Sequence, residues 1–358
     1  MVKRAWPKRL ALILSALSLL TLLGCQTGQT TSSSTGQEPP EREPKPRAET
    51  RISVAFANPA TSLTAQLLKE CAWEWEERSG GTVDVNIFSG GRLGNDALLL
   101  EAAIQGTVSV VKMDVNLFEE VIPEASLVGI PYTFDSPEEY NALMQGEYGD
   151  VFQSYYEAAG LRLLNTTALS WKCLTSNVRL KEAADLEKLK IRVFDNDSLK
   201  CYWSSCGAQV DDLAFSELYM ALHDNTFNSQ ENSQEAVITN SLYEVQDYLY
   251  ETRHMLTTHA FVMNLEQYNA LTPEVQEALE AFLNEFTLRY RREVEGTNEK
   301  ELQELVSKGQ LKVQPLPEAV RTALVQGREP VIQSLRELLG DQTVDQFLEA
   351  VKKTKNDF

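Results

Sequence analysis

The order of apolar and polar positions after residue 50 switches repeatedly between strand and helix periods. Residues 51–56 and 83–88 are short segments rich in Ile, Val and Phe, as is typical of strands. Between them, residues 62–78 place apolar side chains at helical spacing, and Gly80 and Gly81 end that helix. Helix, glycine turn and strand recur farther along the chain. The pattern therefore predicts an α/β fold with much of its sheet parallel.

One helix is expected to be much longer than the others. Thr272 and Pro273 form a strong helix start, and apolar residues continue at helical spacing up to Gly309. About 36 residues at about 1.5 Å each make a rod about 54 Å long, more than the width of one small lobe. Residues 296–298, Gly-Thr-Asn, are the weakest part of this helix and the place where it would kink.

The N-terminal segment has the pattern of an export signal. Four basic residues precede an apolar run at residues 10–23, which is too short for a comfortable membrane span. The run ends in Leu-Leu-Gly-Cys and resembles a bacterial lipobox, so we expect residues 1–24 to be a signal peptide and Cys25 to carry the lipid. The alternative is an ordinary signal peptide with an incidental cysteine. Residues 26–50 are polar and predict a disordered tether.

Composition excludes several classes of function. The chain has 358 residues and a formal charge of −19, which becomes −23 once the four basic residues of the signal are removed. Such an acidic chain repels nucleic acid and anionic membranes. Nothing after residue 23 is apolar enough to span a bilayer, so a membrane tether is expected but a pore is not. The length is sufficient for two lobes.

The chemistry-bearing residue types form no enzyme motif that we recognise. There is no P-loop, no His-Glu-x-x-His and no Cys-x-x-Cys, and we predict neither a cofactor nor a metal site. The histidines are expected to be structural: His223, His254 and His259. The cysteines other than Cys25 allow three disulfide pairings, and their redox state stays open: Cys71, Cys173, Cys201 and Cys206.

Seven short segments, taken together, are typical of one protein family. They are residues 88–94, 101–107, 129–134, 189–193, 206–222, 230–232 and 243–246. Among them are Glu-Ala-Ala-Ile-Gln-Gly-Thr, Leu-Lys-Ile-Arg-Val, Phe-Ser-Glu-Leu-Tyr-Met-Ala-Leu, Gln-Glu-Asn and Tyr-Glu-Val-Gln. In content and order they resemble motifs of the solute receptors of tripartite ATP-independent periplasmic (TRAP) transporters, of the C4-dicarboxylate-binding type. The resemblance covers roughly residues 51 to 315.

The resemblance implies a fold and a task. The fold is α/β, of the periplasmic-binding-protein type, with two lobes and a long helix that spans both. Residues 51–169 and about 258–297 would form lobe I, and residues 170–257 and about 298–355 lobe II. The implied protein is a receptor and not an enzyme: it binds a small organic acid, such as a dicarboxylate, and delivers it to the small and large membrane subunits of a TRAP permease. We expect a monomer on the extracytoplasmic face of the membrane.

The resemblance also nominates ligand-binding residues. Arg192 matches the arginine that grips the ligand carboxylate with a bidentate fork. Lys172 stands where the family usually has a second arginine, and it is either a point-charge contact or a rim lysine that never touches ligand. Asn232 matches an asparagine that hydrogen-bonds the ligand. Trp171 and Phe215 are candidates for the pocket wall.

Two other classes of function stay open. A lipid-anchored hydrolase would use a Ser or Cys nucleophile, and Cys173 is its best candidate, because the neighbouring Lys172 would lower the pKa of the thiol. A receptor of the ABC type, or a signalling input module of similar shape, would share much of the pattern. The identity of the acid and the Gram type of the source are not determined by the residues.

Overall fold

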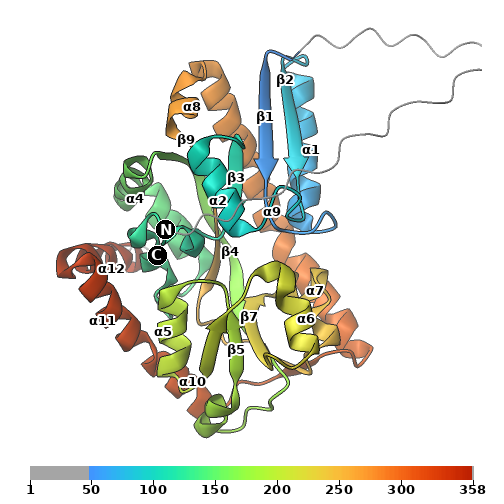
Figure 1. The fold of residues 1–358 in the computed structure, drawn as a ribbon, viewed down its shortest axis with the longest axis vertical. Helices are drawn as coiled ribbons and strands as arrows, with labels where there is room; N and C mark the ends of the chain where they lie inside the picture. The colour runs from blue at the N-terminus through green and yellow to red at the C-terminus, as the bar shows by residue number, and fades with distance from the viewer. Residues whose placement is uncertain (1–47, 357–358) are drawn as a thin grey trace, which may run out of the picture. The chain divides into compact units, whose positions relative to one another are not determined.

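A single long strand connects two groups of strands. The structure, a computed structural model, describes residues 48–356, which belong to one compact unit. In this part of the chain, strand β4 lies between the order β2-β1-β3-β9 on one side and β7-β5-β6 on the other, and β8 and β10 join beside it (Figure 1). The strands are β1 (Thr50–Ala55), β2 (Val83–Phe88), β3 (Val110–Met113), β4 (Leu161–Ser176), β5 (Lys190–Val193), β6 (Gln209–Asp212), β7 (Ser229–Ser233), β8 (Tyr248–Tyr250), β9 (Leu256–Asn264) and β10 (Lys312–Gln314).

Helices cover both groups of strands. They are α1 (Leu63–Arg78), α2 (Asp96–Gln105), α3 (Pro137–Gln145), α4 (Glu147–Ala158), α5 (Asp197–Ser205), α6 (Leu218–His223), α7 (Gln234–Thr239), α8 (Leu265–Ala270), α9 (Pro273–Ser307), α10 (Glu318–Gln326), α11 (Arg328–Leu339) and α12 (Asp341–Asn356). The mixed α/β class expected from the sequence is confirmed.

The sheet is less parallel than its helix-strand alternation indicated. β1 pairs in parallel with β2 and β3, and β5 pairs in parallel with β6 and β7. The centre is antiparallel, because β4 runs opposite to β9 and to β7. Two register shifts interrupt the β4–β9 ladder, between Leu163 and Asn165 and between Ala168 and Ser170. Such irregularities bend a strand, and the second of them lies just before Lys172, where β4 begins to pair with β7.

The first predicted helix forms as expected. Ser62 caps α1, because its Oγ accepts a hydrogen bond from the backbone N–H of Ala65 at 3.2 Å. Gly80 and Gly81 follow the helix with φ of 64° and 81°, a backbone region that favours glycine. Trp75 of α1 stacks on Phe282 of α9, with 5.3 Å between the ring centroids. These contacts place α1 and α9 in one core.

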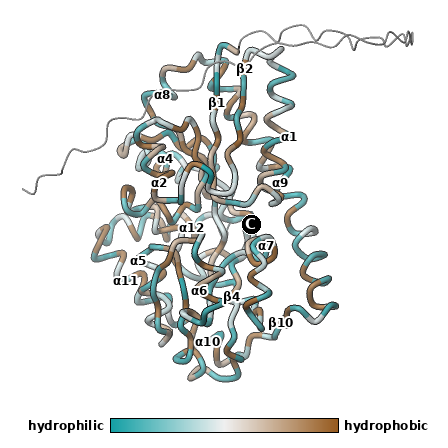
Figure 2. The backbone as a smooth tube through the Cα atoms, turned by 45° about the vertical axis from the view of Figure 1, so that its right-hand side comes forward, coloured by the Kyte–Doolittle hydropathy of each residue, from teal (hydrophilic) through white to brown (hydrophobic). Residues whose placement is uncertain are grey.

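Helix α9 contributes to two separate hydrophobic cores. It runs without interruption from Pro273 to Ser307 and passes through Gly296. Phe282 and neighbouring apolar residues pack into the core beside α1, whereas Leu302 and Leu305 belong to another core with α6, α7 and β8. Figure 2 shows that polar and apolar residues alternate along this helix. The long helix predicted from the sequence is thus confirmed.

Several expectations fall outside the described residues. The signal peptide at residues 1–24, the lipid site at Cys25 and nearly all of the tether belong to residues 1–47. Strand β1 already begins at Thr50, the last residue predicted for the tether. The lobe boundaries remain a prediction, and the boundary expected at residues 169 and 170 falls within β4. From residue 48 to residue 356, no helix combines the length and apolar character needed to cross a membrane.

Candidate functional site

Arg192 is a buried arginine held in place by a backbone carbonyl. It lies on β5, between β6 and β7, and its relative exposure is 2%. Its Nε donates a hydrogen bond to the carbonyl oxygen of Leu213 at 2.8 Å, and Nη2 donates to the same oxygen. The Phe215 ring lies 5.9 Å from the guanidinium carbon. The side chain is therefore fixed by a neutral acceptor and an aromatic neighbour.

The charge of Arg192 has no carboxylate partner in the described part of the chain. None of the ion pairs within 4.0 Å includes Arg192. Burial lowers the pKa of the guanidinium to about 10, although Glu231, Asp96 and Asp212 oppose this at longer range. A buried charge is costly unless a counter-charge meets it. No acceptor among the described residues binds Nη1, so the site offers an anion a guanidinium that is already oriented.

A cavity of about 620 Å³ lies against Arg192. Phe194, Leu213 and Phe215 contribute to its wall on the side of β5. Residues around α2 and β3 also line the cavity, namely Asn95, Asp96, Leu100, Met113 and Leu117. A second cavity of about 450 Å³ shares Asn95, Asp96 and Phe215 with the first. The structure therefore brings two of the predicted site residues, Arg192 and Phe215, to one cavity.

Lys172 is buried in an ion-pair network. Its Nζ lies 3.1 Å from Glu231 Oε1 and 3.9 Å from Asp114 Oδ2, and it sits 4.6 Å from the centre of the Phe194 ring. The other oxygen of Glu231 lies 2.6 Å from His254 Nε2. Burial raises the pKa of Glu231, but Lys172 and His254 outweigh burial and lower this pKa to about 2. The positive charge of Lys172 is thus largely neutralised within the protein.

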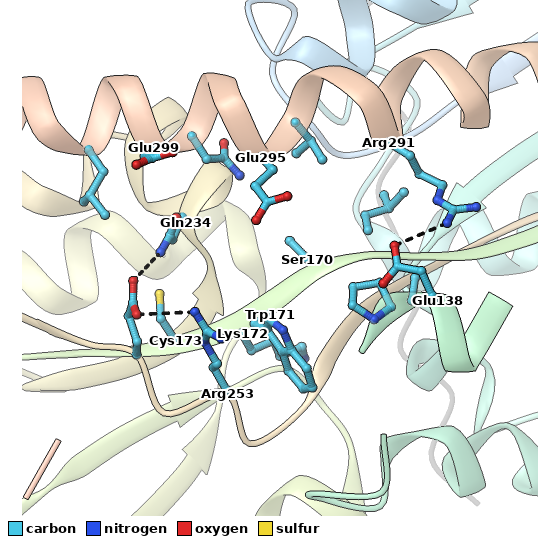
Figure 3. A pocket seen from close by; sticks show the side chains of 17 residues that line it. Glu138, Ser170, Trp171, Lys172, Cys173, Gln234, Arg253, Arg291, Glu295 and Glu299 are labelled. Carbon is cyan, nitrogen blue, oxygen red and sulfur yellow. Dashed lines mark hydrogen bonds and ion pairs between the residues drawn. The ribbon is translucent and has the colours of Figure 1, made fainter. Parts of the chain in front are cut away.

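Trp171 and Lys172 line a different cavity, of about 480 Å³, between β4 and α9. Figure 3 shows this cavity, with the ion pair between Arg291 and Glu138 on one side and Arg253 on the other. Asn232 lies on β7 opposite Cys173, and its Oδ1 accepts a hydrogen bond from the backbone N–H of Ser233 at 3.1 Å. It lines none of the three cavities described here. A ligand role for these three residues stays a prediction.

Lys112 is a buried cation that the sequence reading missed. Its exposure is 3%, its Nζ donates to Asn58 Oδ1 at 2.8 Å, and it lies 3.2 Å from His259 Nε2. Burial lowers the pKa of Lys112 to about 8. The signal was present in the sequence, because Lys112 interrupts the apolar strand Val-Val-Lys-Met. His259, read as a structural histidine, is the neighbour that contacts it.

The cysteines in residues 48–356 are all free thiols. Cys173 is 2% exposed, and burial raises its pKa despite the adjacent Lys172. The Lys172 ammonium points to Glu231, whereas Cys173 Sγ donates to the Asn232 carbonyl oxygen at 3.2 Å. Across the same residues, no group of three or more His, Cys, Asp or Glu side chains is arranged to hold a metal ion.

Proteins of known sequence share long segments with this chain. The C4-dicarboxylate-binding periplasmic protein DctP of Rhodobacter capsulatus is 27% identical over 270 residues, 75% of this chain and 81% of that protein. The 2,3-diketo-L-gulonate-binding periplasmic protein YiaO of Escherichia coli is 28% identical over 205 residues, 57% of this chain. The chain matches 62% of that relative's length, which is less than two thirds.

Solved structures share the fold, and a family model covers most of the chain. The sugar acid binding protein DctPAm of Advenella mimigardefordensis, in complex with galactonate, superposes with a TM-score of 0.80 at 25% identity, over 87% of this chain and 99% of that one. A TRAP periplasmic solute binding protein of Shewanella oneidensis, with bound succinate, gives 0.78 at 21% identity, over 84% and 99%. The model of bacterial extracellular solute-binding protein family 7 matches residues 54–338. This chain is therefore an extracytoplasmic solute-binding protein of family 7, the family of the TRAP-transporter receptors.

Proposed function

We propose that this protein binds a small organic acid through a carboxylate held by Arg192 and delivers it to a TRAP-type permease in the membrane. The observation that carries the proposal is the buried guanidinium, which has no carboxylate partner among residues 48–356 and lies at the wall of a cavity of about 620 Å³. A planar guanidinium matches two carboxylate oxygens and stays charged at physiological pH. The relatives named for dicarboxylates and sugar acids agree with this chemistry.

Isothermal titration of organic acids into the wild type and the variant Arg192→Ala tests the site. We expect the variant to lose about 2–5 kcal/mol of binding free energy, because a buried charge pair is broken. Arg51→Ala is the matched control, since Arg51 is exposed and lies 3.7 Å from Asp84 at the edge of the fold. Unchanged affinity in the Arg192 variant would show that the acid binds elsewhere.

Of the other predicted ligand contacts, one lines the cavity beside Arg192 and three do not. Phe215 lines the cavity directly and lies against Arg192. Lys172 lies on β4 and Asn232 on β7, and β7 pairs with both β4 and β5, the strand that holds Arg192. We propose that Lys172 acts chiefly by holding Glu231, and that Asn232 and Trp171 reach ligand only if the binding cleft changes shape. Phe215→Ala should weaken binding more than Trp171→Ala in the same titration.

The kind of transporter that receives the ligand distinguishes a TRAP receptor from other classes of receptor. A TRAP receptor works with one small and one large membrane subunit, whereas an ABC-type receptor needs an ATPase. We expect genes for the two TRAP subunits beside the gene for this chain. Uptake of the bound acid by cells that express all three proteins should depend on an ion gradient. An ATPase gene in place of the TRAP subunits would overturn the assignment of the partner.

We also propose that Cys25 carries a lipid that retains the mature receptor at the membrane. The support is the sequence Leu-Leu-Gly-Cys at the end of an apolar run. Two or more acyl chains make such an anchor stable. Cells that express the protein and are fed a labelled fatty acid should label the wild type but not Cys25→Ala, and the variant should be released from the membrane. Equal labelling of both proteins would remove the anchor from the proposal.

A receptor of this kind leaves its ligand chemically unchanged. The hydrolase alternative requires a reactive Cys173, and both its burial and the raised pKa of its thiol oppose reactivity. Labelling of the folded protein with a thiol reagent at neutral pH should leave Cys173 unmodified, as mass spectrometry of its peptides would show. Rapid modification of Cys173 would support the hydrolase hypothesis instead.

A further inference from the structure

Asp96 presents a free carboxylate to the cavities beside Arg192. It is the first residue of α2, and the cap of that helix is Asn95, whose side chain accepts from the backbone N–H of Leu98. Asp96 contributes to the walls of both the 620 Å³ and the 450 Å³ cavity. No hydrogen bond or ion pair in residues 48–356 involves its side chain. A partner for this carboxylate must come from whatever fills the cavity.

The neighbouring acidic residues differ from Asp96 because most already have partners. Lys200 lies within 3.7 Å of the carboxylates of Asp195, Asp197 and Asp212. Glu119 accepts a hydrogen bond from Ser126 Oγ at 2.6 Å, and Glu120 is exposed. Asp96 is thus the half-buried acid of this wall that has no partner among the described residues.

Arg192 is the one basic residue that lines either cavity within the described chain. Burial raises the pKa of Asp96, and Lys112 and Arg192 oppose this at longer range. Lys112 lines neither cavity, and its ammonium contacts Asn58 and His259. A ligand in the cavity therefore meets one cation without an ionic partner, Arg192, and one half-buried carboxylate without a partner, Asp96; the other unpaired acid of the wall, Glu120, is exposed. If its carboxylate lies at Arg192, a second carboxylate near Asp96 would place two negative charges together. A hydroxyl or ammonium group there would instead donate a hydrogen bond to an ionised acceptor.

We propose that the organic acid bound by this protein carries, besides the carboxylate held by Arg192, a hydroxyl or ammonium group that donates to Asp96. The inference rests on the proposed function and narrows its ligand class to hydroxy or amino acids. A dicarboxylate belongs to this class only if it also bears such a donor. Asp96 then acts as the specificity-determining residue, because a ligand without a donor leaves its carboxylate desolvated and unpaired.

Matched ligands test the inference on the wild-type protein. Succinate, L-malate and L-aspartate share one carbon chain and differ by a hydrogen, a hydroxyl and an ammonium group. Hexanoate and D-gluconate make the same comparison for a longer chain. In titration calorimetry at neutral pH, we expect the donor-bearing member of at least one set to bind tenfold to a hundredfold more tightly than the donor-free member. A preference for ammonium over hydroxyl, or the reverse, identifies which donor Asp96 receives.

The variant Asp96→Asn assigns the preference to this residue. It should lower the ratio between donor-bearing and donor-free ligands at least tenfold, and the loss should be larger for an ammonium ligand than for a hydroxyl ligand. Asp150→Asn is the matched control, because Asp150 also lies in the first turn of a helix, α4, but is exposed and outside the cavities. It should leave the ratio unchanged.

The outcomes separate the inference from the proposed function. Equal or tighter binding of the donor-free acid in every set that binds would overturn the inference and leave the receptor assignment intact. An unchanged ratio in Asp96→Asn would also overturn it. If Arg192→Ala leaves the binding of all these acids unchanged, the proposed function fails first, and the inference fails with it.

Discussion

At the scale of single residues, we expect the largest loss of stability from changes to the buried network of Lys172, Glu231 and His254. Removal of one partner leaves a buried charge without compensation. We expect Lys172→Met to lower the free energy of unfolding by about 3–5 kcal/mol, measured by urea denaturation at pH 7. The control is Lys308→Met, whose ion pair with Glu304 is exposed and should contribute at most about 0.5 kcal/mol. Similar losses in both variants would contradict this account.

The same network sets a dependence on pH. The pKa of Glu231 is lowered to about 2 in the folded protein, against 4.5 for an ordinary glutamate. Because the folded-state pKa lies below the unfolded one, the stabilisation by the carboxylate is complete above about pH 4.5 and is lost as pH falls towards 2. The stability gap between wild type and Glu231→Gln should therefore shrink between pH 5 and pH 3 in urea titrations. A constant gap over this range would show that Glu231 does not titrate as described.

The sequence predicts an individual site residue where that residue belongs to a recognisable motif. It does not predict a residue whose role depends only on contacts in the folded protein. Arg192 stood in a recognisable Lys-Ile-Arg-Val segment, and it lines the cavity. The sequence pairs Lys172 with Cys173 because the two are adjacent in the chain, but the partner of Lys172 is Glu231, 59 positions away, and His254, which contacts Glu231, is 82 positions away. Spacing along the chain carries no information on such a contact. Asp96 gave no signal beyond an acid at a helix start.

At the scale of elements, two glycines in helices should respond in opposite ways to the same change. A Cβ added to Gly296 of α9 meets no atom within 4 Å, so Gly296→Ala should stabilise the protein by about 0.5–1 kcal/mol. A Cβ added to Gly149 of α4 lies 2.0 Å from the carbonyl oxygen of Met144, and the backbone must shift. Gly149→Ala should cost about 1–3 kcal/mol. Thermal unfolding of both variants checks the pair, and a loss in Gly296→Ala would indicate that α9 is bent there.

Elements were predictable where their signals are local. Helix α1 follows the cap Ser62, and α9 follows Thr272 and begins with Pro273, so the starts of both helices could be predicted from adjacent residues. Strand β4 has 16 residues, but polar residues such as Asn165 and Ser170 interrupt its apolar pattern in the sequence. It is stabilised by β9, whose residues lie about 90 positions later in the chain. The antiparallel centre of the sheet depends on that distant pairing, which no local pattern predicts.

At the scale of the whole molecule, the negative charge should slow the arrival of an anionic ligand. The full chain has a formal charge of −19, while Arg192 is the one basic residue among those described that lines the cavity. Screening shortens the reach of charge from about 30 Å at 0.01 M salt to about 8 Å at 0.15 M. We expect the association rate for an acid to rise severalfold between these salt concentrations in stopped-flow fluorescence, with little change in the dissociation rate. A falling association rate would mean that the local field at the cavity is attractive.

The carbonyl oxygen of Leu213 has a consequence for the energetics of recognition. It accepts two N–H groups of Arg192, so the rotamer of this long side chain is fixed before ligand arrives. A flexible arginine would lose conformational entropy on binding, commonly about 0.5–1.5 kcal/mol for one immobilised side chain. In this protein the side chain of Arg192 loses that conformational entropy during folding, before any ligand binds. The receptor therefore meets each ligand molecule with a preorganised guanidinium, and turnover between capture and release does not require the arginine to be ordered anew.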